Sequence, residues 1–204
     1  MAFEKNDNSA ANKKFDKNLL KNIKRVSVDF DGVLMRMLLG REWVRFTTSY
    51  KTGNNLLFIF DKNLGFVGNH WLRFIHKFRK RTPGSDRGLK FFNEIFDEVL
   101  LLTSRRDYLS KATTEWLKLH GLYEYFLKLV FRDIEKIPWD FKVFKVGELE
   151  IDLHIDDDYK SMVLLAETYP AKVFIYFSSE RGKKIDAPNV VTVFSWDEIL
   201  GLFR

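Results

Sequence analysis

The sequence predicts an α/β fold built on a parallel sheet that helices cover on both faces. Six short apolar runs have the length and composition of strands, and helical patterns separate the later runs. The runs are almost continuously apolar, which is typical of strands buried on both faces of a parallel sheet. Strands that alternate with helices favour the same arrangement. We therefore expect three layers in a Rossmann-like order, with the sheet in the middle.

Each predicted element rests on a local pattern. The apolar runs place strands at 26–30, 97–104, 127–131, 151–155, 171–177 and 189–194. Helical periodicity places helices at 108–121, 141–149, 161–169 and 195–203. Gly121 is expected to end the first of these helices, because glycine readily adopts the left-handed conformation found at helix C-termini. Ser195, with Glu198 three residues later, matches a capping box and is expected to begin the last helix.

The alternation is interrupted between the first two strands. Residues 1–17 are polar and are predicted to form a flexible leader, and residues 18–204 are predicted to form a single core domain. Within the core, residues 35–96 are predicted as an insertion that contains a hairpin and then helices at 69–81 and 89–96. The size of this insertion suits a flap or a small cap.

Composition narrows the kinds of site that the chain can carry. The sequence has no Cys, which excludes disulfides, thiolate metal sites and a Cys nucleophile. The net charge of +6 favours anionic partners but is too small to indicate nucleic-acid binding by itself. No apolar stretch approaches the roughly 18 residues of a membrane span, and the first residues lack the apolar segment of a secretory signal. We therefore expect a soluble, cytoplasmic protein.

Three of the predicted strands run directly into acidic or hydroxyl side chains. Asp29 and Asp31 stand at the end of the first strand, Thr103 at the end of the second, and Asp156 and Asp157 at the end of the fourth. In a parallel sheet, the carboxyl ends of the strands lie at one edge, and ligands bind there. These residues are therefore expected to come together at one site.

Carboxylates in this arrangement are suited to phosphoryl transfer. Asp29 can attack phosphorus as a nucleophile, and Asp31 can protonate the leaving group and later activate water. Carboxylates this close together favour a divalent cation, and oxygen ligands of this kind suit Mg²⁺, for which Asp156 and Asp157 would supply further ligands. An Asp-x-Asp pair alone is most often a solvated turn, so this interpretation depends on the second acidic cluster.

The remaining parts of a phosphate site are also present. The Thr103 hydroxyl and the amides after it could bind a phosphoryl oxygen. Lys142 or Lys145 could neutralise the transferring group. Lys142 is preferred, because it is predicted to open its helix on the catalytic edge.

Taken together, these motifs resemble the haloacid dehalogenase (HAD) superfamily of phosphohydrolases. The resemblance rests on "DFDGVL", "LLLTSR", a Lys on the helix before the fourth strand, and "LHIDDD", in the expected order, and it covers roughly residues 25–200. It implies a HAD-like fold, Mg²⁺ as cofactor, Asp29 as nucleophile and Asp31 as acid/base. It also implies that Asp31 offers its backbone carbonyl to the metal. Thr103 would then be the phosphate-binding hydroxyl, and Asp157 the main acidic metal ligand beside Asp156.

Several further residues are assigned from their positions beside these motifs. Gly32, Ser104 and Arg105 are expected to contact the substrate. Ser104 could instead cap the next helix, and of Arg105 and Arg106 one is expected to face the site. Two other residues are given structural roles: Asp158 is expected to cap a helix, and His154 to pack in the core.

The sequence therefore predicts a Mg²⁺-dependent phosphatase that acts on a small phosphorylated metabolite. One alternative is a phosphatase for nucleotides or nucleic-acid ends, because the chain is basic and aromatic and bases stack on aromatic rings. Another is a scaffold that keeps the fold without turnover. A membrane surface is a minor alternative for the basic, aromatic helix predicted at 69–81. No motif indicates the identity of the substrate or the oligomeric state.

Overall fold

The computed structural model describes residues 17–36, 79–133, 137–179 and 183–204. Their centre is a sheet of six parallel strands in the order β3-β2-β1-β4-β5-β6. The strands are β1 (Arg25–Val28), β2 (Glu98–Arg106), β3 (Lys128–Arg132), β4 (Leu153–Asp156), β5 (Val173–Phe177) and β6 (Val190–Val193). The predicted parallel α/β sheet is confirmed.

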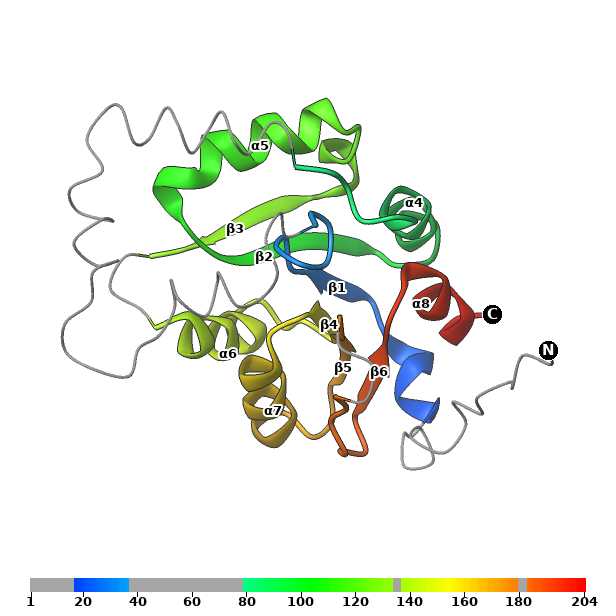
Figure 1. The fold of residues 1–204 in the computed structure, drawn as a ribbon. Helices are drawn as coiled ribbons and strands as arrows, with labels where there is room; N and C mark the ends of the chain where they lie inside the picture. The colour runs from blue at the N-terminus through cyan, green and yellow to red at the C-terminus, as the bar shows by residue number, and fades with distance from the viewer. Residues whose placement is uncertain (1–16, 37–78, 134–136, 180–182) are drawn as a thin grey trace, which may run out of the picture.

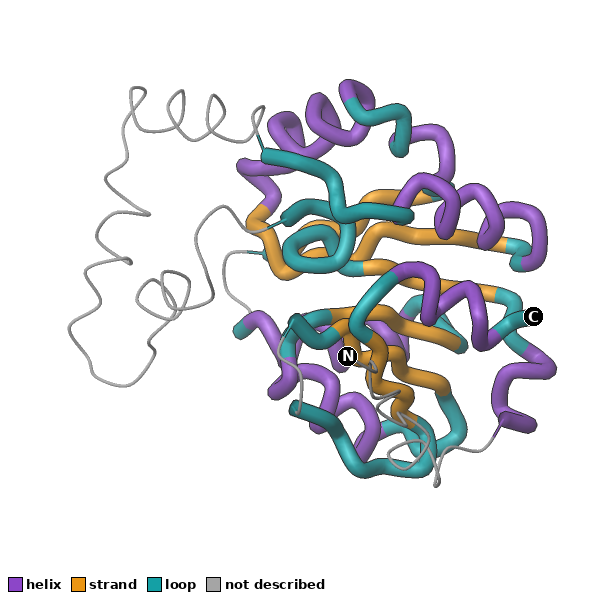
Figure 2. Tube along the Cα trace, turned by 45° about the vertical axis from the view of Figure 1, so that its right-hand side comes forward, coloured by secondary structure: helices purple, strands orange, loops and turns teal. Residues whose placement is uncertain are grey.

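Helices cover both faces of the sheet, as Figures 1 and 2 show. One face carries α4 (Ser85–Ile95), α5 (Ser110–Leu119) and α8 (Trp196–Leu202), and the other carries α6 (Pro138–Glu148) and α7 (Tyr159–Thr168). Three short 3₁₀ helices complete the described elements: η2 (Lys17–Asn22), η3 (Asp107–Leu109) and η4 (Tyr123–Tyr125). The predicted three-layer arrangement is therefore present.

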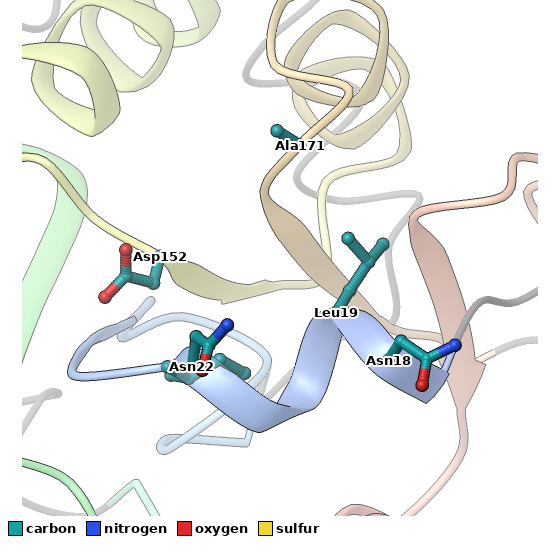
Figure 3. A pocket seen from close by; sticks show the side chains of 6 residues that line it. Asn18, Leu19, Asn22, Asp152 and Ala171 are labelled. Carbon is teal, nitrogen blue, oxygen red and sulfur yellow. The ribbon is translucent and has the colours of Figure 1, made fainter.

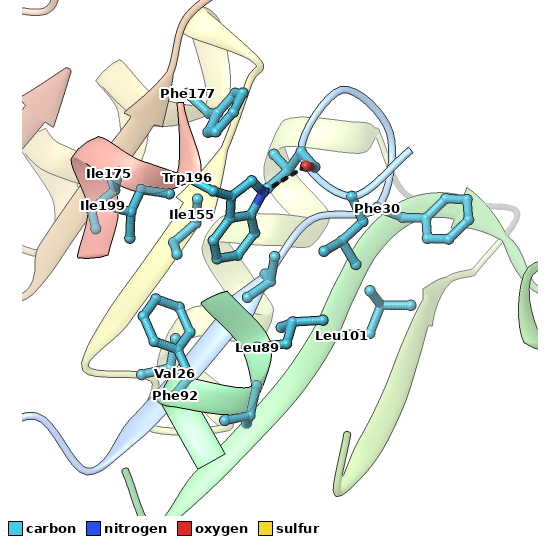
Figure 4. Close-up of a cluster of buried hydrophobic side chains, with 14 of the residues drawn as sticks. Val26, Phe30, Leu89, Phe92, Leu101, Ile155, Ile175, Phe177, Trp196 and Ile199 are labelled. Atoms are coloured by element: carbon cyan, nitrogen blue, oxygen red, sulfur yellow. Dashed lines mark hydrogen bonds between the residues drawn. The ribbon is translucent and has the colours of Figure 1, made fainter. Parts of the chain in front are cut away.

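The continuous apolar strands contribute to two separate cores. Along β2, Leu101 packs into the core under α4, α5 and α8, whereas Leu100 and Leu102 pack into the core under α6 and α7. In the first core, Trp196 packs against Phe92 with ring centroids 5.7 Å apart, and its indole N–H donates to the Val33 carbonyl at 3.0 Å (Figure 4). Burying a large apolar side chain stabilises a fold by about 1.5–3 kcal/mol, so these contacts hold α8 and the loop after β1 firmly on the sheet.

The chain changes direction in the sheet between β1 and β4. From β1 it builds outward through α4 to β2 and β3, and α6 then carries it back to β4 on the other side. Such a reversal opens a crevice at the carboxyl ends of the two strands. The Asp29 N–H donates to the Ile155 carbonyl at 2.9 Å, which extends the β1–β4 pairing by one residue. Asp29 therefore lies beside the end of β4.

Some predicted helix ends agree with the structure, and others do not. Gly121 has φ +64° just after α5, and the Ser195 hydroxyl accepts the Glu198 N–H at 3.2 Å at the start of α8. The start predicted for α6, at residue 141, is wrong, because the helix begins at Pro138. Proline is well suited to the first position of a helix, where its missing N–H costs nothing. Lys142 therefore lies in the second turn rather than at the helix start.

Only part of the predicted insertion is described. The predicted hairpin and most of the helix predicted at 69–81 fall within 37–78, outside the described residues. Nearly all of the predicted leader, residues 1–16, also lies outside the described residues. Residues 79–81 are not helical, and Arg81 instead forms an antiparallel bridge with Met35. The helix predicted at 89–96 is the later part of α4, which begins at Ser85 and packs on the sheet.

A pocket of about 200 Å³ lies at the amino ends of the strands, away from the predicted site. It is lined by Asn18, Leu19, Asn22, Ile23, Asp152 and Ala171 (Figure 3). One Asp152 oxygen accepts the backbone N–H groups of Lys24 and Arg25 at 2.9 Å each, so this carboxylate ties the start of β1 to the start of β4. Among the described helices, none is both long and apolar enough to cross a bilayer.

Candidate active site

A tight turn after β1 separates the two carboxylates of "DFDGVL". Asp29 is buried, whereas the Asp31 side chain is 31% exposed. The Met35 N–H donates to the Phe30 carbonyl at 3.0 Å, and the Gly32 N–H donates to the Met35 carbonyl at 2.9 Å. Between the two aspartates, Phe30 is fully buried in the core. The turn therefore keeps both carboxylates at the carboxyl edge of the sheet.

Lys142 lies between the ends of β1 and β4. Its Nζ is 2.6 Å from Asp156 Oδ2 and 3.3 Å from Asp29 Oδ1, and all three side chains are buried. Lys145 instead pairs with Glu148 on the outer side of α6. The structure thus places Lys142, and not Lys145, against the acidic cluster.

Burial and charge act in opposite directions on this cluster. Burial raises the pKa of Asp29 to about 7, and although Lys142 opposes this shift, the charges of Asp156 and Asp31 add to it. Burial alone would raise the pKa of Asp156, but Lys142 and a hydrogen bond from His154 hold it below the usual range. Burial alone would lower the pKa of Lys142, but Asp156 and Asp29 raise it instead. Lys142 is therefore charged, and Asp29 is the carboxyl that titrates near neutral pH.

The acidic residues also suit a metal ion. Asp29, Asp156 and Asp157 each offer a carboxylate oxygen within 4.8 Å of the others. Asp29 Oδ1 is buried and accepts no hydrogen bond from any described residue, and the charged Lys142 Nζ lies 3.3 Å from it, so a cationic environment already surrounds this oxygen. This all-oxygen set fits Mg²⁺. The Asp31 carboxylate is not part of this group, which leaves its backbone carbonyl as the expected metal contact.

The turn after β1 and the loop after β4 touch at Gly32. This glycine has φ +77°, and a Cβ placed on it would lie 2.1 Å from Asp157 Oδ2. We expected Gly32 to contact the substrate, and the structure shows that it makes room for Asp157.

Replacing this glycine should disturb the acidic cluster. Gly32→Ala is expected to destabilise the protein by about 1–3 kcal/mol, because it adds both backbone strain and a collision. It should also weaken Mg²⁺ binding by displacing Asp157. Urea unfolding and Mg²⁺ titration would measure both effects. Gly201→Ala is the matched control, because nothing lies within 4 Å of its added Cβ. Equal effects of the two substitutions would contradict the prediction.

The hydroxyl residues after Leu102 have different surroundings. Thr103 is 1% exposed, and its Oγ1 accepts the Arg105 N–H at 3.3 Å. Ser104 Oγ donates to the Pro138 carbonyl at 3.4 Å, so it contacts α6 and does not cap α5. The sequence placed Ser104 at the strand end, but β2 runs on to Arg106.

Of the neighbouring arginines Arg105 and Arg106, it is Arg105 that faces the site. Its Nε and Nη2 donate to the two Asp31 oxygens at 2.6 and 2.9 Å. Arg79 Nη1 lies 3.3 Å from the same carboxylate. Sequence reasoning missed Arg79 because it read this residue as one of several basic side chains on a predicted helix.

His154 was correctly placed in the core, but its partners were not foreseen. It is fully buried, with Nδ1 2.8 Å from Ser27 Oγ and Nε2 3.2 Å from Asp156 Oδ2. Burial lowers the pKa of His154, so the ring is neutral at pH 7. The ring therefore supports Asp156 at Oδ2, the same oxygen that Lys142 contacts. Asp158, as expected, caps a helix: its side chain accepts the Ser161 N–H at the start of α7.

Solved structures resemble this chain in fold, although their sequences are very different from it. No protein-family model and no curated protein sequence matches the chain. Among solved structures, CbbY from Rhodobacter sphaeroides in complex with phosphate is 13% identical, covers 89% of this chain and 100% of its own, and has a TM-score of 0.65. A HAD phosphatase from Thermococcus onnurineus is 16% identical, with 89% and 98% covered and a TM-score of 0.64.

A third structure, the HAD-hydrolase YfnB from Bacillus subtilis bound to magnesium, is 13% identical, with 90% of this chain and 100% of its own covered and a TM-score of 0.59. At these identities the likeness concerns the fold. The resemblance inferred from the sequence motifs is confirmed at that level. The chain has the α/β fold of the haloacid dehalogenase-like hydrolases.

Proposed function

We propose that the protein is a Mg²⁺-dependent phosphatase that hydrolyses a phosphomonoester through an aspartyl-phosphate at Asp29. The observation that carries this proposal is the buried Asp29 carboxylate, with Oδ1 lacking a hydrogen bond from any described residue, beside Lys142 and within 4.8 Å of oxygens of Asp156 and Asp157. An ion pair with a purely structural role would need one carboxylate beside Lys142, whereas Asp29, Asp156 and Asp157 lie together here. A phosphoryl group and its cation would use all four side chains.

In the first step, an Asp29 oxygen attacks phosphorus in line with the leaving group. The bond between phosphorus and the leaving-group oxygen breaks, and Asp31 gives that oxygen a proton. Lys142 lies against Asp29 and would neutralise charge on the transferring group. The Thr103 hydroxyl, in the second half of β2, would hold a phosphoryl oxygen.

In the second step, Asp31 takes a proton from water, and the water oxygen attacks phosphorus. The bond between phosphorus and Asp29 breaks, which releases inorganic phosphate and restores the carboxylate. Asp29, Asp157, Asp156 and the Asp31 carbonyl would hold Mg²⁺, which offsets negative charge on the phosphoryl group when bound. His154 keeps Asp156 in place through its hydrogen bond.

Similar structures support the cofactor and the substrate class. YfnB was solved with magnesium, and CbbY was solved with phosphate and, in a mutant form, with xylulose-(1,5)bisphosphate. By analogy, we propose Mg²⁺ as the cofactor and a small phosphorylated metabolite as the substrate.

The test is metal-dependent phosphate release. The purified protein is expected to hydrolyse p-nitrophenyl phosphate with Mg²⁺. EDTA should lower the rate by at least about 100-fold, because charge stabilisation of this kind is worth several kcal/mol. Added Mg²⁺ should restore the rate. A panel of sugar phosphates, nucleotides and a 3′-phosphorylated oligonucleotide would then define the substrate. Calorimetric Mg²⁺ binding without hydrolysis of any phosphomonoester would favour the scaffold alternative.

A further inference from the structure

Two guanidinium groups converge on the Asp31 carboxylate. Arg105 binds both of its oxygens, at 2.6 and 2.9 Å, and Arg79 lies 3.3 Å from Oδ1. The arginine side chains are only 7% and 10% exposed, whereas Asp31 is 31% exposed. The carboxylate therefore lies between two largely buried cations and the solvent at the mouth of the site.

Both arginines are held by contacts of their own. Arg105 Nη1 donates to Thr113 Oγ1 at 3.2 Å, and its guanidinium lies 4.3 Å from the centre of the Phe30 ring. The Arg79 Nε donates to the Arg36 carbonyl at 3.1 Å, and the Arg79 carbonyl accepts the Trp116 indole N–H at 2.9 Å. These contacts do not involve Asp31, so the guanidinium groups would stay in place if that carboxylate moved.

The proposed mechanism requires Asp31 to reach the leaving-group oxygen. When it does so, the two guanidinium groups lose the carboxylate that they share. A buried cation separated from its anion is costly, and planar guanidinium groups match phosphate and carboxylate oxygens well. A second anionic group on the substrate could take the place of Asp31 and release it for catalysis.

On the basis of the proposed function, we propose that Arg79 and Arg105 form a subsite for a second anionic group on the leaving-group side of the substrate. The substrate is then a small phosphomonoester that also carries a phosphate or a carboxylate. In such a subsite, Arg79 is a specificity-determining residue, because it adds a second cation to the one that Arg105 supplies.

Binding of substrate mimics tests the subsite without turnover. In calorimetric titrations with Mg²⁺ present, at least one short alkane diphosphonate is expected to bind about tenfold or more tightly than ethylphosphonate, as one further charge-assisted hydrogen bond would provide. Arg79→Gln should remove most of this preference. A phosphonoalkanoate series shows whether carboxylate serves as well as phosphate.

Two further variants control the result. Arg87→Gln removes a solvent-exposed arginine that pairs with Asp197 and not with Asp31, and it should keep the full preference. Arg79→Lys keeps the charge but loses the planar fork, and it should keep part of the preference. Circular dichroism of each variant verifies folding, and Arg79→Lys provides the comparison if Arg79→Gln does not fold.

The outcomes separate this inference from the proposed function. No diphosphonate preference in the wild type, or an equal preference in Arg79→Gln, would overturn the subsite even if p-nitrophenyl phosphate is hydrolysed. A preference that depends on Arg79, in a protein that hydrolyses no phosphomonoester, would uphold the subsite and reject the phosphatase.

Discussion

Asp29→Asn is expected to abolish phosphatase turnover, with a loss of at least about 10³-fold in kcat, because it removes the attacking oxygen. The fold should persist, since Asn has nearly the same shape and Lys142 keeps its contact with Asp156. The rate with p-nitrophenyl phosphate and Mg²⁺ measures the loss. The matched control is Asp197→Asn, which changes an exposed aspartate paired with Arg87. Activity close to the wild-type rate in Asp29→Asn would exclude the proposed nucleophile.

The same substitution should have a second, pH-dependent effect in the absence of metal. Burial raises the pKa of Asp29 to about 7 from an ordinary value of 3.8, so the folded protein holds a proton there that the unfolded chain releases. The stability of the wild type therefore falls as the pH rises through this window, and it remains lower above pH 7.

Asn carries no charge, so Asp29→Asn does not lose stability through ionisation of a buried carboxyl as the pH rises. In EDTA, Asp29→Asn is expected to be more stable than the wild type at pH 8 by a few kcal/mol at most, since each pKa unit corresponds to about 1.4 kcal/mol. Near pH 4 the difference should largely vanish. Urea unfolding at the two pH values measures it, and a difference that is the same at both would contradict the assignment.

Lys142→Met is expected to be the most destabilising change in the site. It leaves Asp29 and Asp156 buried without their shared cation, and breaking a buried ion pair in this way costs about 3–5 kcal/mol. Turnover should also be lost. Lys145→Met is the matched control on the same helix. It breaks a partly exposed pair with Glu148 and should cost less than about 1 kcal/mol.

Two further measurements separate charge from packing in Lys142→Met. Mg²⁺ should stabilise this variant more than the wild type, because the ion replaces the missing cation. The double variant Lys142→Met/Asp156→Asn should recover part of the lost stability and remain inactive. If thermal unfolding shows similar midpoints for Lys142→Met and Lys145→Met, the buried cluster does not have the energetic role assigned to it.

The strands and their acidic ends were predictable because each is a local pattern. Continuous apolar runs indicated a parallel sheet, and such a sheet brings the strand ends carrying Asp29 and Asp156 to one edge. The choice between Lys142 and Lys145 depended on a helix start that Pro138 places earlier. The preferred residue is still the one that faces the cluster, because its position on the helix directs its side chain inward.

The contacts that were not predicted join residues far apart in the chain. Arg79, well inside the predicted insertion, reaches Asp31 ahead of it, and His154 reaches Ser27 across the β1–β4 pairing. No spacing rule links such pairs, since each depends on how the sheet brings distant segments together. In the sequence, nothing distinguishes Arg79 from the many basic residues near it.

The contact between Gly32 and Asp157 limits how this site could be re-engineered and how it could diversify in evolution. The two residues occupy adjoining space, so the turn after β1 and the loop after β4 cannot be exchanged independently. A side chain at position 32 would require a shorter residue at position 157, and with it the loss of an acidic oxygen from the cluster. Libraries that graft either loop from another protein should therefore vary the two positions as a linked pair.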